Sequence, residues 1–589
     1  MKKIAYLIIV ILIPFISCKK TLLNELPPNF TTADLLYSSG DGFEAGINGL
    51  YSLVSQERNG LNYTAGFGTI DLAATIFTAG TDNIGSGSNV GGLSRIIADW
   101  TQSTPTDPNL DKYFLWLYKI VSSANAIITR ADNPEVNWGS DATRKARVVA
   151  EARTIRAWAY RSLTYLWGDV PLMTTEITGN NIVTDATREK VATIRAVMIE
   201  DLKYASQNLP WQPYKAGRMT RGVAETYLAE TYLAVGKPDS AFIWANDCIT
   251  NGPYKLVTAR YGANASKPGS AFMDMFDPAN VNIGNGNTEA LWVVQWERNA
   301  VGGGDNLMRH ETTMRYPNAK YNSKSGFLTA IDERGGRGWS RQTITKKALL
   351  LYYSSSDSAA GKLDQRGNEY ALRKYYTVTA ADAFAGVTNT AFNRPWAIGD
   401  TVWIATPIAQ GNIKDPGKRA LSGALNFNLL VDGNPNNNDW PYSLKFAFDD
   451  PGFPNTTESH EDEIYLRLAE TILLRAEASG RMGNLNAAAA DINLLRTRAN
   501  AKQVTVANFG STLNSFLNYI LDERSRELLV EEQRRYTLLR MGGADYFYPR
   551  VSTWNTISKN LTLRDTLLPI PQSVIDANLT TKMPQNPGF

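Results

Sequence analysis

Few residues of this 589-residue chain have the types and spacing that enzyme or metal chemistry needs. The chain has two histidines, His310 and His460, and Met314 stands where a zinc-protease helix beginning at His310 would carry its second histidine. A run from Asp432 begins like a calcium-binding loop, but Asn437 replaces the glycine of its turn. The sequence has no nucleophile elbow, phosphate-binding loop or CxxC pair. It therefore favours a protein that is not an enzyme and holds neither cofactor nor metal.

Aromatic side chains are the chemistry that the chain carries in quantity, with 14 Trp, 27 Tyr and 20 Phe. Faces of sugar rings stack on such side chains, while sugar hydroxyls pair with polar groups at the rim of a site. The candidate ligand-binding residues lie in polar loops or on one strand face, and they are Trp100 with Asp82 and Asn83, Trp292 with Trp296, Trp339, and Trp440. Trp100 is the preferred candidate because it follows a loop too rich in Gly, Ser and Asn to form a core. A place in the core is the alternative for each tryptophan.

Apolar periodicity predicts the elements that must position these side chains. The pattern indicates helices at 41–58, 111–131, 142–167, 188–208, 219–235 and 238–250, and a further pair within 464–499. Each pair is joined by a glycine turn, which is typical of tetratricopeptide-like repeats. Residues 78–110 and 252–458 are instead rich in loops, with short strands at 289–297 and 401–406. The predicted fold is mostly α, with tetratricopeptide-like helix pairs forming a scaffold and an irregular, loop-rich region containing short strands.

The stretch from Ile520 to Gly542 predicts one long amphipathic helix. Its apolar stripe is Leu521, Leu528, Leu529, Tyr536 and Leu539. Acids and arginines at i,i+4 spacing, such as the pair at 522 and 526 and the pair at 531 and 535, predict ion pairs within the helix. We expect this helix to be structural and its stripe to be buried.

The residue pattern from Glu523 to Arg534 resembles the ERRxELxxEGxR helix of the SusD/RagB family of outer-membrane nutrient-binding lipoproteins. Glu532 departs from it, since the family usually has Gly there. Five other segments resemble family motifs in the family's order, and they are 151–172, 217–222, 465–478, 492–499 and 568–589. The resemblance therefore covers nearly the whole chain.

The N-terminus has the layout of a lipoprotein signal. Two lysines precede an apolar run from Ile4 to Ile16, and Ser17 and Cys18 follow it. This predicts a signal peptide at 1–17, a lipid on the Cys18 thiol and a tether at 18–40. The other cysteine, Cys248, then has no partner and is expected to be a buried structural thiol.

The resemblance implies a function and a partner for the chain. It would capture an oligosaccharide, or less often a peptide, at the cell outer membrane and deliver it to a TonB-dependent, SusC-like transporter. Residues 41–251 and 459–589 would form the helical scaffold, and 252–458 would hold the ligand. Nucleic acid is not an expected partner, because the net charge is only +3 and no Lys/Arg block exceeds two residues. A lipid-anchored polysaccharide hydrolase stays open as the alternative, since carboxylate pairs cannot be recognised from spacing alone.

Overall fold

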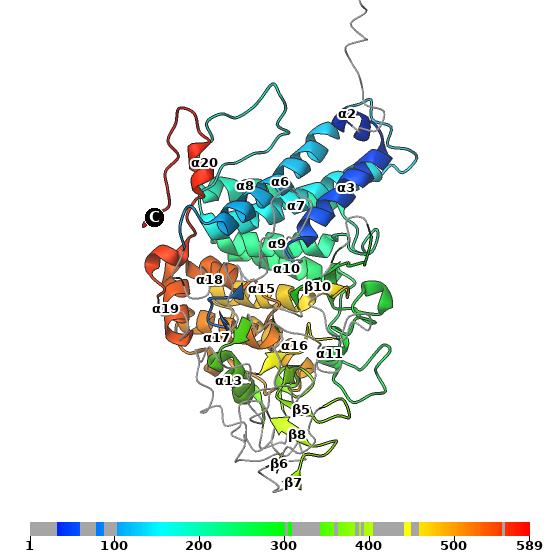
Figure 1. Ribbon diagram of the computed structural model, residues 1–589, viewed down its shortest axis with the longest axis vertical. Coiled ribbons are helices and arrows are strands. Elements are labelled where there is room, and N and C mark those ends of the chain that lie inside the picture. Colours follow the sequence, from blue (N-terminus) through cyan, green and yellow to red (C-terminus); the bar gives the residue numbers. More distant parts are fainter. Residues whose placement is uncertain are drawn as a thin grey trace, which may run out of the picture.

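A computed structural model describes residues 32–58, 78–86, 100, 103–300, 304, 306–308, 312, 342–357, 363–382, 388–389, 394–403, 441–448, 459–555 and 560–589. Helices make up one end and the middle of the molecule, and short strands gather at the other end (Figure 1). No helix in this described part has both the length and the hydropathy needed to span a membrane.

A stack of antiparallel helices forms the scaffold. Its members in chain order are α3 (Gly40–Ser55), α6 (Pro108–Arg130), α7 (Arg144–Trp167), α8 (Val191–Asn208), α9 (Arg221–Ala234), α10 (Pro238–Asn251), α15 (Leu468–Arg481) and α16 (Leu485–Arg498). Consecutive helices from α6 onward pack against each other, and α10 packs against α15 although more than 200 residues separate them. The predicted mostly helical, tetratricopeptide-like scaffold is therefore confirmed.

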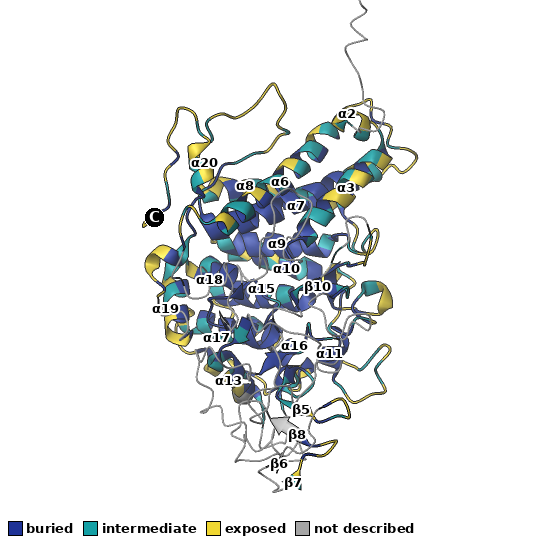
Figure 2. Ribbon diagram, in the orientation of Figure 1, coloured by how far each residue is buried: buried dark blue, intermediate teal, exposed yellow. Residues whose placement is uncertain are grey.

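Local signals explain where these helices begin and end. Ser39 caps α3 by accepting a hydrogen bond from the backbone N–H of Gly42, and Asp107 caps α6 in the same way ahead of Pro108. α7 ends at Gly168, whose φ of 75° suits glycine, and a Cβ there would lie 2.9 Å from Leu567. α7 and α9 are buried on nearly all sides (Figure 2), which places them at the centre of the main core.

The strands of the described part form two-stranded antiparallel pairs. These pairs are β1 (Ile84–Ser86) with β3 (Gln342–Ile344), β2 (Ala290–Val294) with β10 (Glu463–Arg467), β4 (Leu372–Arg373) with β9 (Tyr442–Ser443), β5 (Tyr375–Thr377) with β8 (Thr401–Trp403), and β6 (Thr388–Asn389) with β7 (Arg394–Pro395). Short helices accompany them, namely α2 (Ala33–Leu36), α11 (Ala271–Asp274), α13 (Lys346–Ser355), α20 (Gln572–Asp576) and the 3-10 helices η3 (Ile283–Asn285), η6 (Gln365–Gly367), η9 (Val506–Phe509) and η10 (Leu563–Thr566). Two smaller cores, one around α13 and one around α11, hold this region to the scaffold.

The predicted single helix from Ile520 to Gly542 is wrong, because the structure divides it into α17 (Leu513–Glu527) and α18 (Arg534–Gly542), with α19 (Ala544–Trp554) following. Val530 between them has a φ of 62°, a left-handed conformation that β-branched residues rarely adopt. The break sends Leu528 into the main core and Leu529 and Val530 into the core around α13. Burial of both groups offsets the local strain, which is on the order of 1–3 kcal/mol.

The charges of this stretch pair mostly with other elements, and the one ion pair described within α17 is the i,i+3 pair of Glu523 and Arg526. Asp522 accepts from Lys347 and Arg550, and Glu531 pairs with Lys445 and Arg467. The expected i,i+4 pairs are therefore wrong. The prediction was wrong because helical spacing gives no information about partners that are distant in the sequence.

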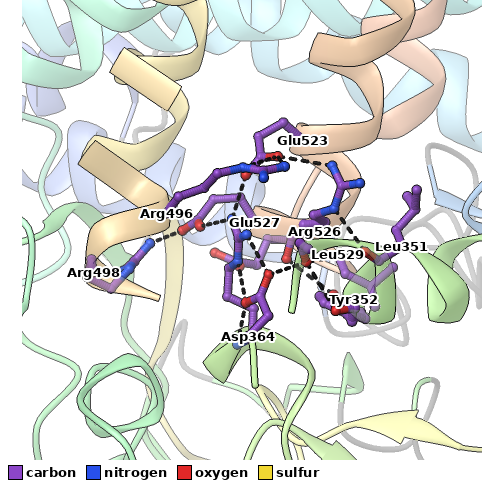
Figure 3. Close-up of polar contacts among 12 residues, drawn as sticks. Leu351, Tyr352, Asp364, Arg496, Arg498, Glu523, Arg526, Glu527 and Leu529 are labelled. Carbon is purple, nitrogen blue, oxygen red and sulfur yellow. Dashed lines mark hydrogen bonds and ion pairs between the residues drawn. The ribbon is translucent and has the colours of Figure 1, made fainter. Parts of the chain in front are cut away.

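These contacts belong to a buried ionic network at the junction of the scaffold and the middle region (Figure 3). Glu527 accepts from Arg467 at 2.6 Å, from Arg366 at 3.1 Å and from Arg498. Glu523 accepts from Arg366 at 2.9 Å, from Arg496 at 2.6 Å and from Arg526 at 3.0 Å. Charges buried in this way need such pairing, because each would otherwise be expensive to remove from water.

Burial and ion pairing shift the pKa values of the buried carboxyls in opposite directions. Burial alone would raise the pKa of Glu523, but the three guanidinium groups around it outweigh burial and lower the pKa to about 2. The same balance lowers the pKa of Glu477 to about 2 and lowers that of Glu527. For Glu57, burial raises the pKa to about 7, and the neighbouring Arg58 offsets only part of the effect.

We expect the free energy of unfolding to be largest near about pH 5. Carboxyls with a depressed pKa stabilise the fold above their ordinary value of 4.5, and this stability is lost as pH falls toward about 2. Glu57 has the opposite sign, so stability decreases as pH rises from about 4.5 to about 7. Glu225, whose pKa burial raises to about 8, contributes to the same decrease. Chemical unfolding at pH 3, 5 and 7 measures both arms, and Glu57→Gln should reduce the slope of the upper one. Equal stability at pH 3 and pH 5 would contradict the expectation.

Candidate ligand-binding site

The structure buries the loop residues that the sequence offered as ligand contacts. The Asp82 carboxylate is fully buried and accepts from Arg534 at 2.7 and 2.8 Å and from Arg550 at 2.8 Å. Asn83 accepts from the hydroxyl of Ser525 at 2.7 Å. Both side chains therefore join the start of the chain to its C-terminal helices. The structure corrects the expectation that they contact a ligand.

Trp100 is also buried, with 2% of its surface exposed. The Arg535 guanidinium lies 4.7 Å from its ring centroid, and the Phe547 ring meets it edge-on at 5.8 Å. These neighbours come from α18 and α19, more than 400 residues along the chain. Trp100 belongs to the main core, which favours the alternative of a core tryptophan over a ligand-stacking one.

The remaining predicted tryptophans divide into two groups. Trp292 and Trp296 are both buried in the main core, and Trp292 also lines the cavity described below. Trp292 lies 4.2 Å from the Tyr465 ring and donates its indole N–H to the carbonyl of Gly217 at 3.0 Å. Trp339 and Trp440 lie outside the described residues, as do His310 and Cys18. Cys248 is buried, as expected for a structural thiol.

A cavity of about 750 Å³ lies where α3, the segment before α9 and the end of β2 meet. Its volume falls within the ~300–1,000 Å³ range of small-molecule sites. Its described lining combines two aromatic side chains with many polar ones. The lining includes Tyr51, Gln56, Arg218, Trp292, Gln295 and Glu297. This mixture of ring faces and hydrogen-bonding groups is the chemistry that sugars require.

The aromatic wall of the cavity is held by a fixed set of contacts. The Tyr51 hydroxyl accepts from the backbone N–H of Met219 at 2.7 Å, and the Arg218 guanidinium lies 5.0 Å from the Tyr51 ring centroid. Arg218 in turn donates to Glu151 at 2.6 Å and to Asn48 at 2.6 Å. Burial raises the pKa of Tyr51 well above its usual value, so its hydroxyl keeps its proton. The ring is therefore preorganised before any ligand arrives.

Glycine is required at the base of this wall. Gly217 has a φ of 82°, and a Cβ there would lie 2.8 Å from Cγ of Gln295. The Gln295 side chain donates to Asn282 at 2.8 Å, so it has little freedom to move aside. The glycine lets Arg218 turn toward Tyr51 while the backbone passes close to the strand.

One polar atom in the lining has no partner within the described structure. The side-chain oxygen of Gln56 is buried without a hydrogen bond, and the residue is only 6% exposed. A buried acceptor without a partner is costly, and such atoms are usually satisfied by protein, water or ligand. Its place in the cavity lining makes it a candidate contact for a ligand hydroxyl.

Sequence reasoning missed these residues. Tyr51 belongs to the apolar stripe predicted for the 41–58 helix, so the pattern assigned it to the hydrophobic core. Gln56 carries no signal of its own, because only the approach of β2 encloses it. Arg218 lies in a segment that resembles a family motif, which is the one sequence signal at this site.

A model of the SusD family matches residues 288–589, slightly more than half of the chain. The chain belongs to the SusD family. A second family model, described as starch-binding associating with outer membrane, matches residues 72–233. The resemblance inferred from the sequence motifs is thus confirmed, and the two matches together extend over both parts of the helical scaffold.

Individual relatives in the SusD family resemble the chain along its whole length. SusD-like protein P2 of Formosa agariphila is 24% identical over 602 residues, which cover 100% of both chains. The crystal structure of a SusD homolog from Bacteroides thetaiotaomicron has a TM-score of 0.67 and 18% identity, covering 94% of this chain and 97% of the other. A structure titled laminarin binding SusD-like protein has a TM-score of 0.63 and 19% identity, covering 94% and 100%. The two structural similarities show that the fold is shared.

Proposed function

We propose that this SusD-family chain is a binding protein that captures an oligosaccharide in the 750 Å³ cavity. The observation that carries the proposal is that one cavity is lined by both Gln56, whose side-chain oxygen is unpartnered, and the fixed ring of Tyr51. A sugar ring would pack on Tyr51, and one of its hydroxyls would donate to Gln56. A related protein whose structure is titled laminarin binding supports this class of ligand.

The middle region, 252–458, supplies one side of this proposed site. Gln295 and Glu297 follow β2 and face α3 across the cavity. Trp292 supports the floor rather than stacking on the ligand, because the Tyr465 ring lies against it. We propose that recognition depends on polar contacts from α3 and from the residues after β2.

Oligosaccharide binding to the Gln56→Met protein tests this site. We expect affinity to fall by about 1 kcal/mol, roughly fivefold, since the variant keeps its volume but loses the acceptor. Stability should not fall, because the oxygen has no protein partner to lose. The measurement is calorimetric titration with the tightest ligand found on a glycan array. Gln365→Met is the matched control, because its buried side-chain oxygen is also unpartnered but lies outside this cavity. Equal affinity of the Gln56→Met and wild-type proteins would contradict the proposal.

Binding is better supported than hydrolysis. Glycoside hydrolases use two carboxyl groups on either side of the scissile bond. Among the described residues that line the cavity, Glu297 is the one acid. Release of reducing sugar from a polysaccharide would overturn this choice in favour of a lipid-anchored hydrolase.

We further propose that a lipid on Cys18 anchors the protein to the outer membrane, where it delivers its ligand to a TonB-dependent transporter. The signal layout before Cys18 and the outer-membrane description of the matching family model support this. We expect Cys18→Ala to move the protein from the membrane pellet to the soluble fraction. Mild detergent extraction of the wild type should recover the transporter with it. Retention of Cys18→Ala in salt-washed membranes would contradict the anchor, and repeated recovery of the wild type alone would contradict the partner.

A further inference from the structure

Five large aliphatic side chains are exposed at one end of the molecule, and we call this set the apolar ridge. Its members are Leu35, Ile177, Ile182, Val183 and Leu579, and their exposed fractions lie between 42% and 75%. They come from α2, from the loop between α7 and α8, and from the segment after α20. These segments lie along the upper edge of Figure 1, with α20 at the left, α2 at the right and the loop between them, and much of their surface is exposed in Figure 2.

Hydrogen bonds and ion pairs join the segments of the ridge. Arg130 pairs with Asp34 at 2.5 Å and with Glu176 at 2.7 Å, so it connects the residues next to Leu35 and Ile177. At the other side, the Leu579 backbone N–H donates to the carbonyl of Thr184 at 3.1 Å. The Asp185 carboxylate accepts from the backbone N–H groups of Thr580 and Thr581, at 2.7 and 2.6 Å. The ridge is therefore one surface rather than scattered exposed residues.

The charge pattern of the loop favours an apolar partner. Residues 177–184 (ITGNNIVT) are all exposed and contain no ionisable side chain. Glu176 and Asp185 flank this tip, and no Lys or Arg lies between 172 and 187. A surface that bound an anionic partner would carry basic residues here. Aliphatic and neutral polar side chains instead suit the boundary between lipid headgroups and acyl chains.

We propose that the apolar ridge docks onto the lipid surface of the membrane, with Ile182, Val183 and Leu579 entering the headgroup boundary. The choice of lipid rests on the proposed anchor at Cys18. The described chain begins at Thr32, whose hydroxyl accepts from the N–H of Leu35 in the ridge. Thirteen residues separate Cys18 from Thr32, and the fourteen steps between them span at most about 50 Å. The anchor thus keeps this end of the molecule near the membrane and raises the effective concentration of the ridge at the lipid.

Flotation with neutral phosphatidylcholine vesicles tests the ridge independently of the anchor. The protein is the chain from residue 18 onward with Cys18→Ala, which carries no lipid and keeps every described contact because these begin at Thr32. We expect this protein to float with an excess of vesicles but to be released by washing, because a few aliphatic side chains bind lipid more weakly and more reversibly than an acyl anchor. Ile182→Asp with Leu579→Asp should reduce the partition coefficient at least about tenfold. Ile243→Asp on α10, also at an exposed position, is the matched control and should have no effect. Thermal melts confirm that all variants are folded.

The outcomes separate the ridge from the anchor. If the lipid-free protein fails to float, or if the ridge variant floats as well as the control, the ridge proposal is overturned whatever the state of Cys18. If the ridge variant loses only the co-purifying transporter, the surface binds protein, and the lipid assignment is again overturned. Recovery of the wild-type protein in the soluble fraction of washed native membranes, with vesicle binding of the lipid-free protein intact, would count against the anchor alone.

Discussion

The free energy of unfolding of the Glu527→Gln protein is expected to fall by about 3–5 kcal/mol. Glu527 is fully buried and accepts from the guanidinium groups of Arg366, Arg467 and Arg498, whose side chains are each at most 1% exposed. Glutamine keeps the size of the side chain but removes the charge that three buried cations share. Arg366, Arg467 and Arg498 keep other carboxylate partners, but the buried network loses one of its shared negative charges. An excess of buried positive charge costs more than the loss of a single hydrogen bond.

Chemical unfolding at pH 7 measures this change. Glu200→Gln is the matched control, since Glu200 lies at the surface, 71% exposed, and pairs with Lys203 at 3.1 Å. Its loss should alter the free energy by no more than about 0.5 kcal/mol. Equal stability losses in the two variants would show that the buried network is not what holds the middle region to the scaffold.

Trp100→Ala is expected to destabilise the fold by about 3–5 kcal/mol, the range for removing a buried tryptophan. The ring fills the core between α18 and α19 and also covers Arg535. The Nε and Nη1 atoms of this guanidinium have no hydrogen-bond partner, and burial lowers its pKa to about 10. Removing the aromatic face therefore leaves a cavity and also a poorly compensated buried cation.

Three comparisons isolate the cause. Trp100→Phe should lose less stability, because it keeps an aromatic face toward Arg535. Trp554→Ala, at a tryptophan that is 44% exposed on α19, should cost far less. Oligosaccharide affinity of the folded Trp100→Ala protein should equal that of the wild type. A folded variant with normal stability and weakened binding would restore Trp100 to the ligand site.

Helices with self-contained patterns could be predicted closely. The 142–167 pattern corresponds to α7 (Arg144–Trp167), because a long apolar stripe and a glycine stop both lie within the segment. The break between α17 and α18 could not be predicted in the same way. Residues 528–533 continue the helical spacing, but their side chains pair with Arg467 and Lys445 from distant elements. A one-dimensional pattern does not contain those partners.

The candidate site was harder to predict for a related reason. Asp82, Asn83 and Trp100 lie in a stretch whose composition is typical of an exposed loop. Their partners Arg534, Ser525 and Arg535 are more than 400 residues away, so composition gave no indication of their burial. Gln56, in contrast, ends a helix that was predicted well, and only the neighbouring strand reveals its enclosure. Local signals determine elements, whereas the site depends on which elements meet.

The packing of α10 against α15 has a consequence for how this chain can change over evolution. The chain leaves the helical stack after α10 and re-enters it at α15, directly beside the point of departure. The two ends of the intervening segment are held at fixed positions next to each other. The entropic free-energy cost of closing such a loop rises by only about 0.6 kcal/mol for each doubling of its length. Insertions and deletions within that segment therefore cost the stack little. The helical stack can therefore stay constant while the segment between α10 and α15 changes in length and sequence.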